Sequence, residues 1–273
     1  MQFLDATLNE IDVRGMQKRS AKESDCSKLI AEDCTVMVNG EPKIIYIARV
    51  KHAAIERARN AVQRVKYSTS TRTSGLVTTS RIFGYAPRNT LRGHPCRAVS
   101  LAVDQPAEHD AICAAAQAID QFYRQHFPAI HGHHREVATK VREQWMIPGS
   151  VFTSGIVNYN NPLQYHFDAG NFSQVCSAML GFRRKTTGGH LACPELDIAF
   201  EIGDRSLILF DGQKLLHGVT PIHRSGTDSF RYTVVYYSLK QMWNCDTVRG
   251  EVDALRERRS ATERRKAMRR HEA

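Results

Sequence analysis

Eight short β-rich segments, separated by glycine, asparagine and proline, fill the chain between Ser150 and Trp243. Each segment has about 5–10 residues and is bounded by turn-forming residues, which is typical of strands in a sandwich or a barrel. The segments are VFTSGIVNY, QYHFD, SQVCSAML, GGHLACP, DIAFEI, RSLILF, LLHGVTPI and FRYTVVYYSL. This pattern constrains the fold most, because so many short strands require two facing sheets or a closed barrel.

The preceding part of the chain mixes helical and polar segments. The spacing of apolar residues predicts helices over residues 51–66, 106–126 and 134–145, and a β-rich run predicts a strand over 43–50. The second helix is the clearest, because Pro106 lies near its first position and Pro128 ends it. Residues 67–93 carry hydroxyls, arginines and glycines but no long apolar run, so we expect mostly loop there.

Composition narrows the class of protein. The chain has 273 residues, is 42% hydrophobic and 24% charged, and carries a formal net charge of +10. These values predict a globular protein, and the excess of positive charge favours a polyanionic partner, with nucleic acid first. No apolar run is long enough to span a membrane, and the start MQFLDATLNEIDVRG lacks a basic region followed by an apolar stretch, so we do not expect secretion. We therefore expect a protein of the cytoplasm, the nucleoid or a host cytoplasm, or of the nucleus if the source is eukaryotic. We also expect it to be a monomer.

Cysteines and clustered histidines suggest no second site. The seven cysteines are scattered, odd in number and without a CxxC pair, which predicts reduced thiols rather than disulfides or a zinc site. Four histidines between His126 and His134 resemble a metal site, but proline and glycine interrupt the segment and it lacks acidic or thiol partners, so we expect a solvated loop. The tail 247–273 has nine Arg or Lys against five Asp or Glu, which indicates a solvated helix or frayed tail, or an auxiliary nucleic-acid contact.

The candidate chemistry lies in the β-rich part. His166 and Asp168 are two residues apart in a predicted strand, so both side chains point to one face. His217 follows in another predicted strand, and two histidines with one carboxylate suit a non-haem Fe(II) oxygenase with three open positions. Arg231 can pair with the distal carboxylate of 2-oxoglutarate, and Thr233 on the same strand face can add a hydrogen bond. A hydrolytic zinc site is a competing use of the triad, but it would not explain the arginine.

These motifs together resemble the 2-oxoglutarate/Fe(II) dioxygenases, and within them the TET/JBP-like group that oxidises the methyl group of a DNA base. The resemblance covers about residues 145–243 through NYNNPLQYHFDAGNF, TTGGHLACPELDIAF, GDRSLILFDGQKLLHGVTPI and RYTVVYYSLKQMW. It implies a mainly β fold with flanking helices, namely a double-stranded β-helix (jelly roll, cupin-like) core with N-terminal helices packed outside. It also implies Fe(II) and 2-oxoglutarate as cofactors, dioxygen as co-substrate and ascorbate as the reductant in vitro.

The resemblance also implies residue roles. It assigns iron binding and catalysis to His166, Asp168 and His217, and 2-oxoglutarate binding to Arg231 and Thr233. Asn171 matches an asparagine that hydrogen-bonds the flipped base, and Tyr237 matches an aromatic residue that stacks on it. Leu239 replaces the polar base contact of animal TET proteins, which leaves 5-methylcytosine and thymine open as targets. The cysteine-rich zinc region of the animal enzymes is also absent from this sequence.

We therefore expect one dioxygenase domain over 1–273, with an α/β support and DNA-contact region at 1–145, the β-helix core at 146–243 and a basic tail at 244–273. The expected reaction oxidises the 5-methyl group of a pyrimidine that is flipped out of DNA. The polar loop 67–93, with Arg72, Arg81 and Arg88, is the candidate phosphate contact. The alternatives are a hydroxylase of a protein side chain, an RNA base or a free nucleotide, and a catalytically inactive barrel that binds nucleic acid.

Overall fold

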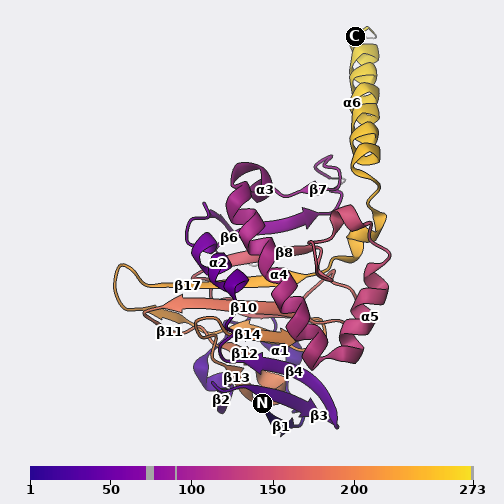
Figure 1. The fold of residues 1–273 in the computed structure, drawn as a ribbon. Coiled ribbons are helices and arrows are strands. Elements are labelled where there is room, and N and C mark those ends of the chain that lie inside the picture. Colours follow the sequence, from indigo (N-terminus) through magenta and orange to yellow (C-terminus); the bar gives the residue numbers. More distant parts are fainter. Residues whose placement is uncertain (72–76, 90, 272–273) are drawn as a thin grey trace.

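Two facing β-sheets form the centre of the protein, with helices on one side (Figure 1). The computed structural model describes residues 1–71, 77–89 and 91–271, with side chains as far as residue 265. The described strands form a ten-stranded major sheet, a five-stranded minor sheet and a two-stranded ribbon. This arrangement is the double-stranded β-helix with flanking helices that the sequence predicts.

The major sheet has an order that is far from sequential. It runs β1 (Gln2–Ala6), β3 (Cys34–Val38), β4 (Glu41–Ile47), β14 (Leu207–Phe210), β10 (Ser177–Arg184), β17 (Phe230–Tyr237), β8 (Ser154–Tyr159), β6 (Val77–Ala86) and β5 (Ser68–Thr71), with β7 (Arg97–Ala98) on β6. Strands from the N-terminal part of the chain therefore extend the core sheet at both edges.

The minor sheet faces the central strands of the major sheet and carries two of the candidate metal ligands. Its order is β2 (Lys28–Ile30), β13 (Ile198–Phe200), β12 (Leu191–Cys193), β15 (His217–Val219) and β9 (Leu163–His166), and the ribbon pairs β11 (Thr186–Gly188) with β16 (Ile222–Arg224). All eight β-rich segments of the sequence thus contain a strand.

Several helices cover the outer face of the major sheet, and six helices in all occur among the described residues. They are α1 (Val13–Met16), α2 (Ala53–Val62), α3 (Ser100–Asp104), α4 (Pro106–His126), α5 (Pro128–Ala138) and α6 (Val248–His271), with short 3₁₀ turns η1 (Glu23–Asp25), η2 (Glu143–Trp145), η3 (Pro194–Leu196) and η4 (Lys240–Asn244). Helices α2 and α4 bury their apolar side chains against that sheet, whereas α6 projects away from the body (Figure 1). The bounds of α4 are those that the two prolines predict.

The side chains of the major sheet alternate between its two faces, and each face contributes to a separate hydrophobic cluster. On β17, Tyr232, Val234 and Tyr236 pack with the helices in one hydrophobic cluster. Side chains of a strand alternate between its faces, so Arg231 and Thr233 point into the space between the sheets. The second cluster fills that space and includes Met179, Ile208, Phe210 and Leu191. The strand period therefore determines which residues of β17 can reach the candidate site.

Three expectations about local structure are wrong. Residues 68–71 and 77–86 form the antiparallel strands β5 and β6 instead of a loop, because β5 lies at the exposed sheet edge and β6 buries few side chains, so neither needs an apolar run. The helix expected over 134–145 instead spans Pro128–Ala138, with Pro128 in its first turn, and residues 143–145 form a separate 3₁₀ turn. The histidine segment is not a solvated loop: His126 ends α4, and the other three histidines lie on α5, where His131 and His134 are buried.

The cysteine prediction is also wrong in one respect. Cys96 and Cys245 form a disulfide across 149 residues of sequence, because the connection after β6 and the segment after η4 meet in the fold. The other five cysteines are free thiols, and four of them are buried. Among the described residues, no helix has the length and apolar character needed to cross a bilayer.

Candidate active site

The candidate metal ligands converge because two strands of the minor sheet lie side by side. β9 and β15 pair antiparallel, with His166 directly opposite His217. Asp168 follows β9 by two residues, and one ligand atom from each of the three side chains lies within 4.8 Å of the others. The Asp168 Oδ1 atom is 3.9 Å from Nε2 of His166 and 3.8 Å from Nε2 of His217. The fold therefore brings together the triad predicted from the sequence.

Backbone hydrogen bonds determine which ring nitrogen of each histidine faces this point. Nδ1 of His166 lies 2.8 Å from the carbonyl oxygen of Gln164, and Nδ1 of His217 lies 2.9 Å from that of Leu215. A carbonyl only accepts, so Nδ1–H donates in both rings and the Nε2 lone pair remains available. Burial, followed by the proximity of His166, lowers the pKa of His217 to about 4, which keeps this ring neutral near pH 7.

The loop after β14 positions Asp168. The backbone N–H of Asp168 donates to the carbonyl oxygen of Gly212 at 2.8 Å. A Cβ atom at Gly212 would lie 2.3 Å from Oδ2 of Asp168, so only glycine leaves room for this carboxylate. Phe210 packs edge-to-face on the His217 ring, with centroids 5.0 Å apart. Backbone contacts and an aromatic wall thus hold the ligands in place before any ion binds.

The triad opens into a cavity of about 340 Å³ between the sheets. The lining combines the three candidate ligands with apolar walls and a few polar groups, namely Ile156, Asn158, Leu163, His166, Phe167, Asp168, Ala169, Asn171, Ser177, Met179, Leu191, Phe210, His217, Val219, Thr233, Val235, Tyr237 and Leu239. An apolar cavity with a few convergent polar groups is typical of a small-molecule site. A larger cavity elsewhere lacks the triad and lies beside β3, β4 and α5.

Arg231 is a buried cation without an acidic partner among the described residues. Its side chain is 1% exposed, Nη2 donates to the Gly189 carbonyl oxygen at 2.6 Å, and buried Nε has no hydrogen-bond partner. Burial, and secondarily Arg183 on the opposite strand, lower the pKa of Arg231 to about 9. Burying an uncompensated charge is costly. The guanidinium is therefore suited to a carboxylate supplied by a ligand.

Arg231 itself is not among the residues that line the cavity, whereas the remaining predicted residues occupy its walls. Thr233 is buried and faces the cavity from β17. Asn171 pairs across a β-bridge with Leu239, and its Nδ2 donates to Ser177 Oγ at 3.2 Å and to Asp168 Oδ2 at 3.5 Å. Tyr237 and Leu239 complete this side of the cavity. The candidate base contacts thus lie on one wall beside the candidate metal ligands.

Of the candidate DNA-contacting arginines, Arg81 and Arg88 are not among the residues that line this cavity. Arg81 lies on β6, where it forms an ion pair with Asp104. Arg88 forms an ion pair with the buried Glu251 of α6. Arg72 lies outside the described residues. The structure therefore places Arg81 and Arg88 in intramolecular ion pairs, and their contact with DNA stays a prediction.

Sequence reasoning missed three residues that shape the site. Asn158 on β8 lies opposite Thr233 and lines the cavity, and Ser177 holds the Asn171 amide. A polar residue at an inward position of a strand is a signal that could have found both. Gly212 carried no such signal, because the Asp-Gly pair reads as an ordinary turn.

The donor set fits a divalent first-row metal. Two neutral imidazoles and one carboxylate are the ligands of the facial triad that non-haem Fe(II) sites use. Arg231, with its unpaired Nε, fits the distal carboxylate of a 2-oxo acid. The fold and the site together define a protein with the architecture and the ligand set of an Fe(II)/2-oxoglutarate oxygenase.

Comparison with known proteins identifies the family. Residues 82–240, more than half of the chain, match the Tet_JBP family, the oxygenase domain of the 2OGFeDO superfamily. The chain belongs to this family. Among curated proteins it is similar to the bifunctional helicase and thymine dioxygenase JBP2 of Leishmania tarentolae, with 30% identity over 119 residues, and to that of Leishmania infantum, with 31%. Each match covers 44% of this chain but only 10% of the relative.

A solved structure shows the same fold. NgTET1 in complex with 5mC DNA superimposes with a TM-score of 0.62 over 93% of this chain and 90% of that one, at 13% sequence identity. The low identity means that this similarity supports the architecture and does not transfer individual contacts.

Proposed function

We propose that this protein is an Fe(II)- and 2-oxoglutarate-dependent dioxygenase that oxidises the 5-methyl group of a pyrimidine in DNA. One observation carries the proposal: the His166–Asp168–His217 triad and a wall of candidate base contacts share one cavity between the sheets. Family membership and the names of the relatives support it, because JBP2 is a thymine dioxygenase and NgTET1 was solved with 5mC DNA.

The protein's own residues would hold two cofactors. His166, Asp168 and His217 would bind iron through two Nε2 atoms and a carboxylate oxygen. Arg231 would pair with the distal carboxylate of 2-oxoglutarate, and Thr233 would add a hydroxyl hydrogen bond on the same strand face. When bound, iron would activate dioxygen, which is the oxidant, and 2-oxoglutarate would supply two electrons as it is oxidised to succinate and carbon dioxide, so that one oxygen atom enters a C–H bond of the substrate.

The substrate base must leave the duplex to reach this site. A 5-methyl group points into the major groove, whereas the triad lies between two sheets, so the nucleotide must rotate out of the stack. Extrusion costs a few kcal/mol, which stacking and edge contacts offset. Tyr237 would stack on the base, and the Asn171 amide, held by Ser177, would contact its edge.

The pyrimidine could be 5-methylcytosine or thymine, because both present the same methyl group. The aliphatic Leu239 on this wall offers no hydrogen bond that would separate the 4-amino group of one from the 4-oxo group of the other. The oxidation could stop at the hydroxymethyl stage or continue. We also propose that the protein acts as a monomer on DNA and that all of 1–273 forms one catalytic domain.

A product assay tests the proposal directly. The full chain is incubated with Fe(II), 2-oxoglutarate and ascorbate on duplex DNA that carries either 5-methylcytosine or only thymine, and the nucleosides are measured by mass spectrometry. We expect an oxidised pyrimidine from at least one duplex, and its loss in His166→Ala. His223→Ala, which removes an exposed histidine, is the matched control and should retain activity.

Other substrates appear as outcomes of the same experiment. Succinate release that RNA, a free nucleotide or a protein stimulates, without any oxidised pyrimidine in DNA, would overturn the assignment of substrate. Binding of DNA without any consumption of 2-oxoglutarate would overturn the enzymatic assignment and leave a binding barrel.

A further inference from the structure

Helix α6 is a long basic helix that packs on the body only at its base. From Arg256 to Arg265 every side chain is exposed, and this stretch holds five arginines and two glutamates. Figure 1 shows the helix projecting from the rest of the molecule, at the end opposite the N-terminus. Helices in proteins gain most of their stability from packing an apolar face, and this stretch has none. An extended, unpacked helix of this kind is suited to a partner outside the chain.

Among the described side chains of the stretch 256–265, the unpaired arginines outnumber the unpaired acidic residues, which are Glu257 and Glu263. Arg249 and Arg256 lie 3.7 and 3.6 Å from the carboxylate of Asp253, so those charges are partly compensated. The four remaining arginines within the described side chains, Arg258, Arg259, Arg264 and Arg265, form no ion pair there. Arg258 and Arg265 are seven residues apart and therefore lie about 10 Å apart on one side of the helix. Both guanidinium groups can therefore contact the same line of negative charges on a partner.

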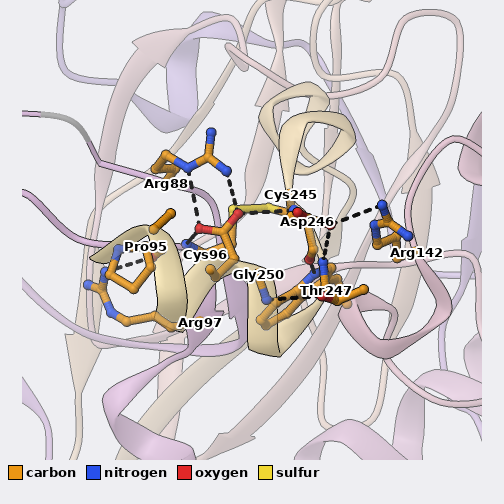
Figure 2. Close-up of polar contacts among 12 residues, drawn as sticks. Arg88, Pro95, Cys96, Arg97, Arg142, Cys245, Asp246, Thr247 and Gly250 are labelled. Carbon is orange, nitrogen blue, oxygen red and sulfur yellow. Dashed lines mark hydrogen bonds and ion pairs between the residues drawn. A yellow bond between two sulfur atoms is a disulfide. The ribbon is translucent and has the colours of Figure 1, made fainter. Parts of the chain in front are cut away.

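A buried carboxylate and a nearby disulfide anchor the base of the helix to the body. Glu251 is 1% exposed and accepts hydrogen bonds from Arg88 and from the backbone N–H groups of Cys96 and Asp246, each of the latter at 3.0 Å. Burial opposes its charge, but these donors lower the pKa of Glu251 and keep it ionised. The Cys96–Cys245 disulfide lies beside this network (Figure 2). The direction of the helix is thus set by the body and not by a flexible tether.

The anchored base of α6 follows the cavity-lining residue Leu239 closely in the sequence. Leu239 lines the cavity and bridges to Asn171, and η4 follows directly. Trp243 in η4 stacks on Phe172 at 5.0 Å, so the segment stays attached to the loop that carries Asp168. Val248 begins α6 only nine residues after Leu239, which limits their separation to about 30 Å.

We propose that α6 is a DNA-binding arm that contacts the phosphate backbone of the same duplex whose base enters the cavity. This inference rests on the proposed function for the identity of the polyanion. With 24 residues the helix is about 36 Å long, the length of about ten base pairs. A membrane surface is a poorer partner, because interfacial helices need an apolar face and the stretch 256–265 offers only Ala261.

Salt-dependent binding tests the arm. Binding of the full chain to a labelled duplex of about 25 base pairs is measured by fluorescence anisotropy over a range of salt concentrations. The variant replaces Arg258, Arg259, Arg264 and Arg265 by glutamine, and the control replaces the same four by lysine, so helix propensity is similar and only one set keeps the charge. We expect the glutamine variant to bind at least about tenfold more weakly, with a log–log salt slope smaller by about 3, and the lysine variant to resemble the wild type.

Two further readouts separate this proposal from the proposed function. The glutamine variant should bind 2-oxoglutarate with unchanged affinity, because the arm does not line the cavity. Wild-type affinity and salt slope in the glutamine variant would overturn the arm even if the enzyme oxidises DNA. So would α6-dependent binding to acidic phospholipid vesicles or RNA that exceeds binding to the duplex. Binding of duplex through these arginines without any oxidised pyrimidine would instead support the arm and overturn the function.

Discussion

Gly212 is the residue whose substitution gives the sharpest test of the site. In Gly212→Ala the new Cβ would lie 2.3 Å from Oδ2 of Asp168 and 3.1 Å from Cε1 of His217. Since real Cβ contacts do not fall below 3.0 Å, the carboxylate must retreat by at least 3.0 − 2.3 = 0.7 Å. The Asp168 N–H is bound to the Gly212 carbonyl oxygen, so the two backbones cannot simply separate. The displacement therefore falls on the carboxylate of Asp168, the proposed metal ligand.

The expected result is a loss of metal affinity without a loss of fold. Disturbing the support of a metal ligand typically costs about 10- to 100-fold in affinity. Equilibrium dialysis against Fe(II) under anaerobic conditions measures it, and thermal unfolding checks that the variant is folded. Gly132→Ala is the matched control, because a Cβ there meets nothing within 4 Å. If Gly212→Ala binds Fe(II) as tightly as the wild type, the assignment of Asp168 as a ligand held by this loop is refuted.

Three further outcomes are expected. Arg231→Gln should weaken 2-oxoglutarate binding by about 10- to 100-fold in calorimetry, because a charge-assisted hydrogen bond is lost, and unchanged affinity would exclude Arg231 from that site. Burial lowers the pKa of His134 to about 3, so the unfolded state binds the extra proton and stability falls by about 1.4 kcal/mol per pH unit as the pH drops from about 6 to 4. His134→Asn should remove that part of the slope in urea unfolding, and His223→Asn should retain it. Cross-linking Cys96 to Cys245 closes a loop of about 149 residues, worth up to about 5 kcal/mol, so a reductant should destabilise the wild type but not Cys96→Ser.

Local sequence pattern determined much of this protein. The eight β-rich segments, the two prolines that bound α4 and the residue types of the triad all follow from short-range rules on turns, periodicity and ligand chemistry. The two-residue period also places Arg231 and Thr233 on one face of β17 without reference to any other strand. Such features depend only on neighbours in the sequence, and for this reason they could be predicted.

Only the tertiary structure decided which distant residues meet. The pairing of His166 with His217 depends on the register of β9 against β15, and the space for Asp168 depends on Gly212 in a loop far along the chain. The disulfide between Cys96 and Cys245 and the burial of His134 likewise arise from packing across the fold. Arg88 shows the difference most clearly: its DNA contact stays a prediction from charge and position, whereas its ion pair with Glu251 at the base of α6 is seen only in the fold. These contacts join residues that are far apart in the chain, so short-range sequence patterns do not reveal them.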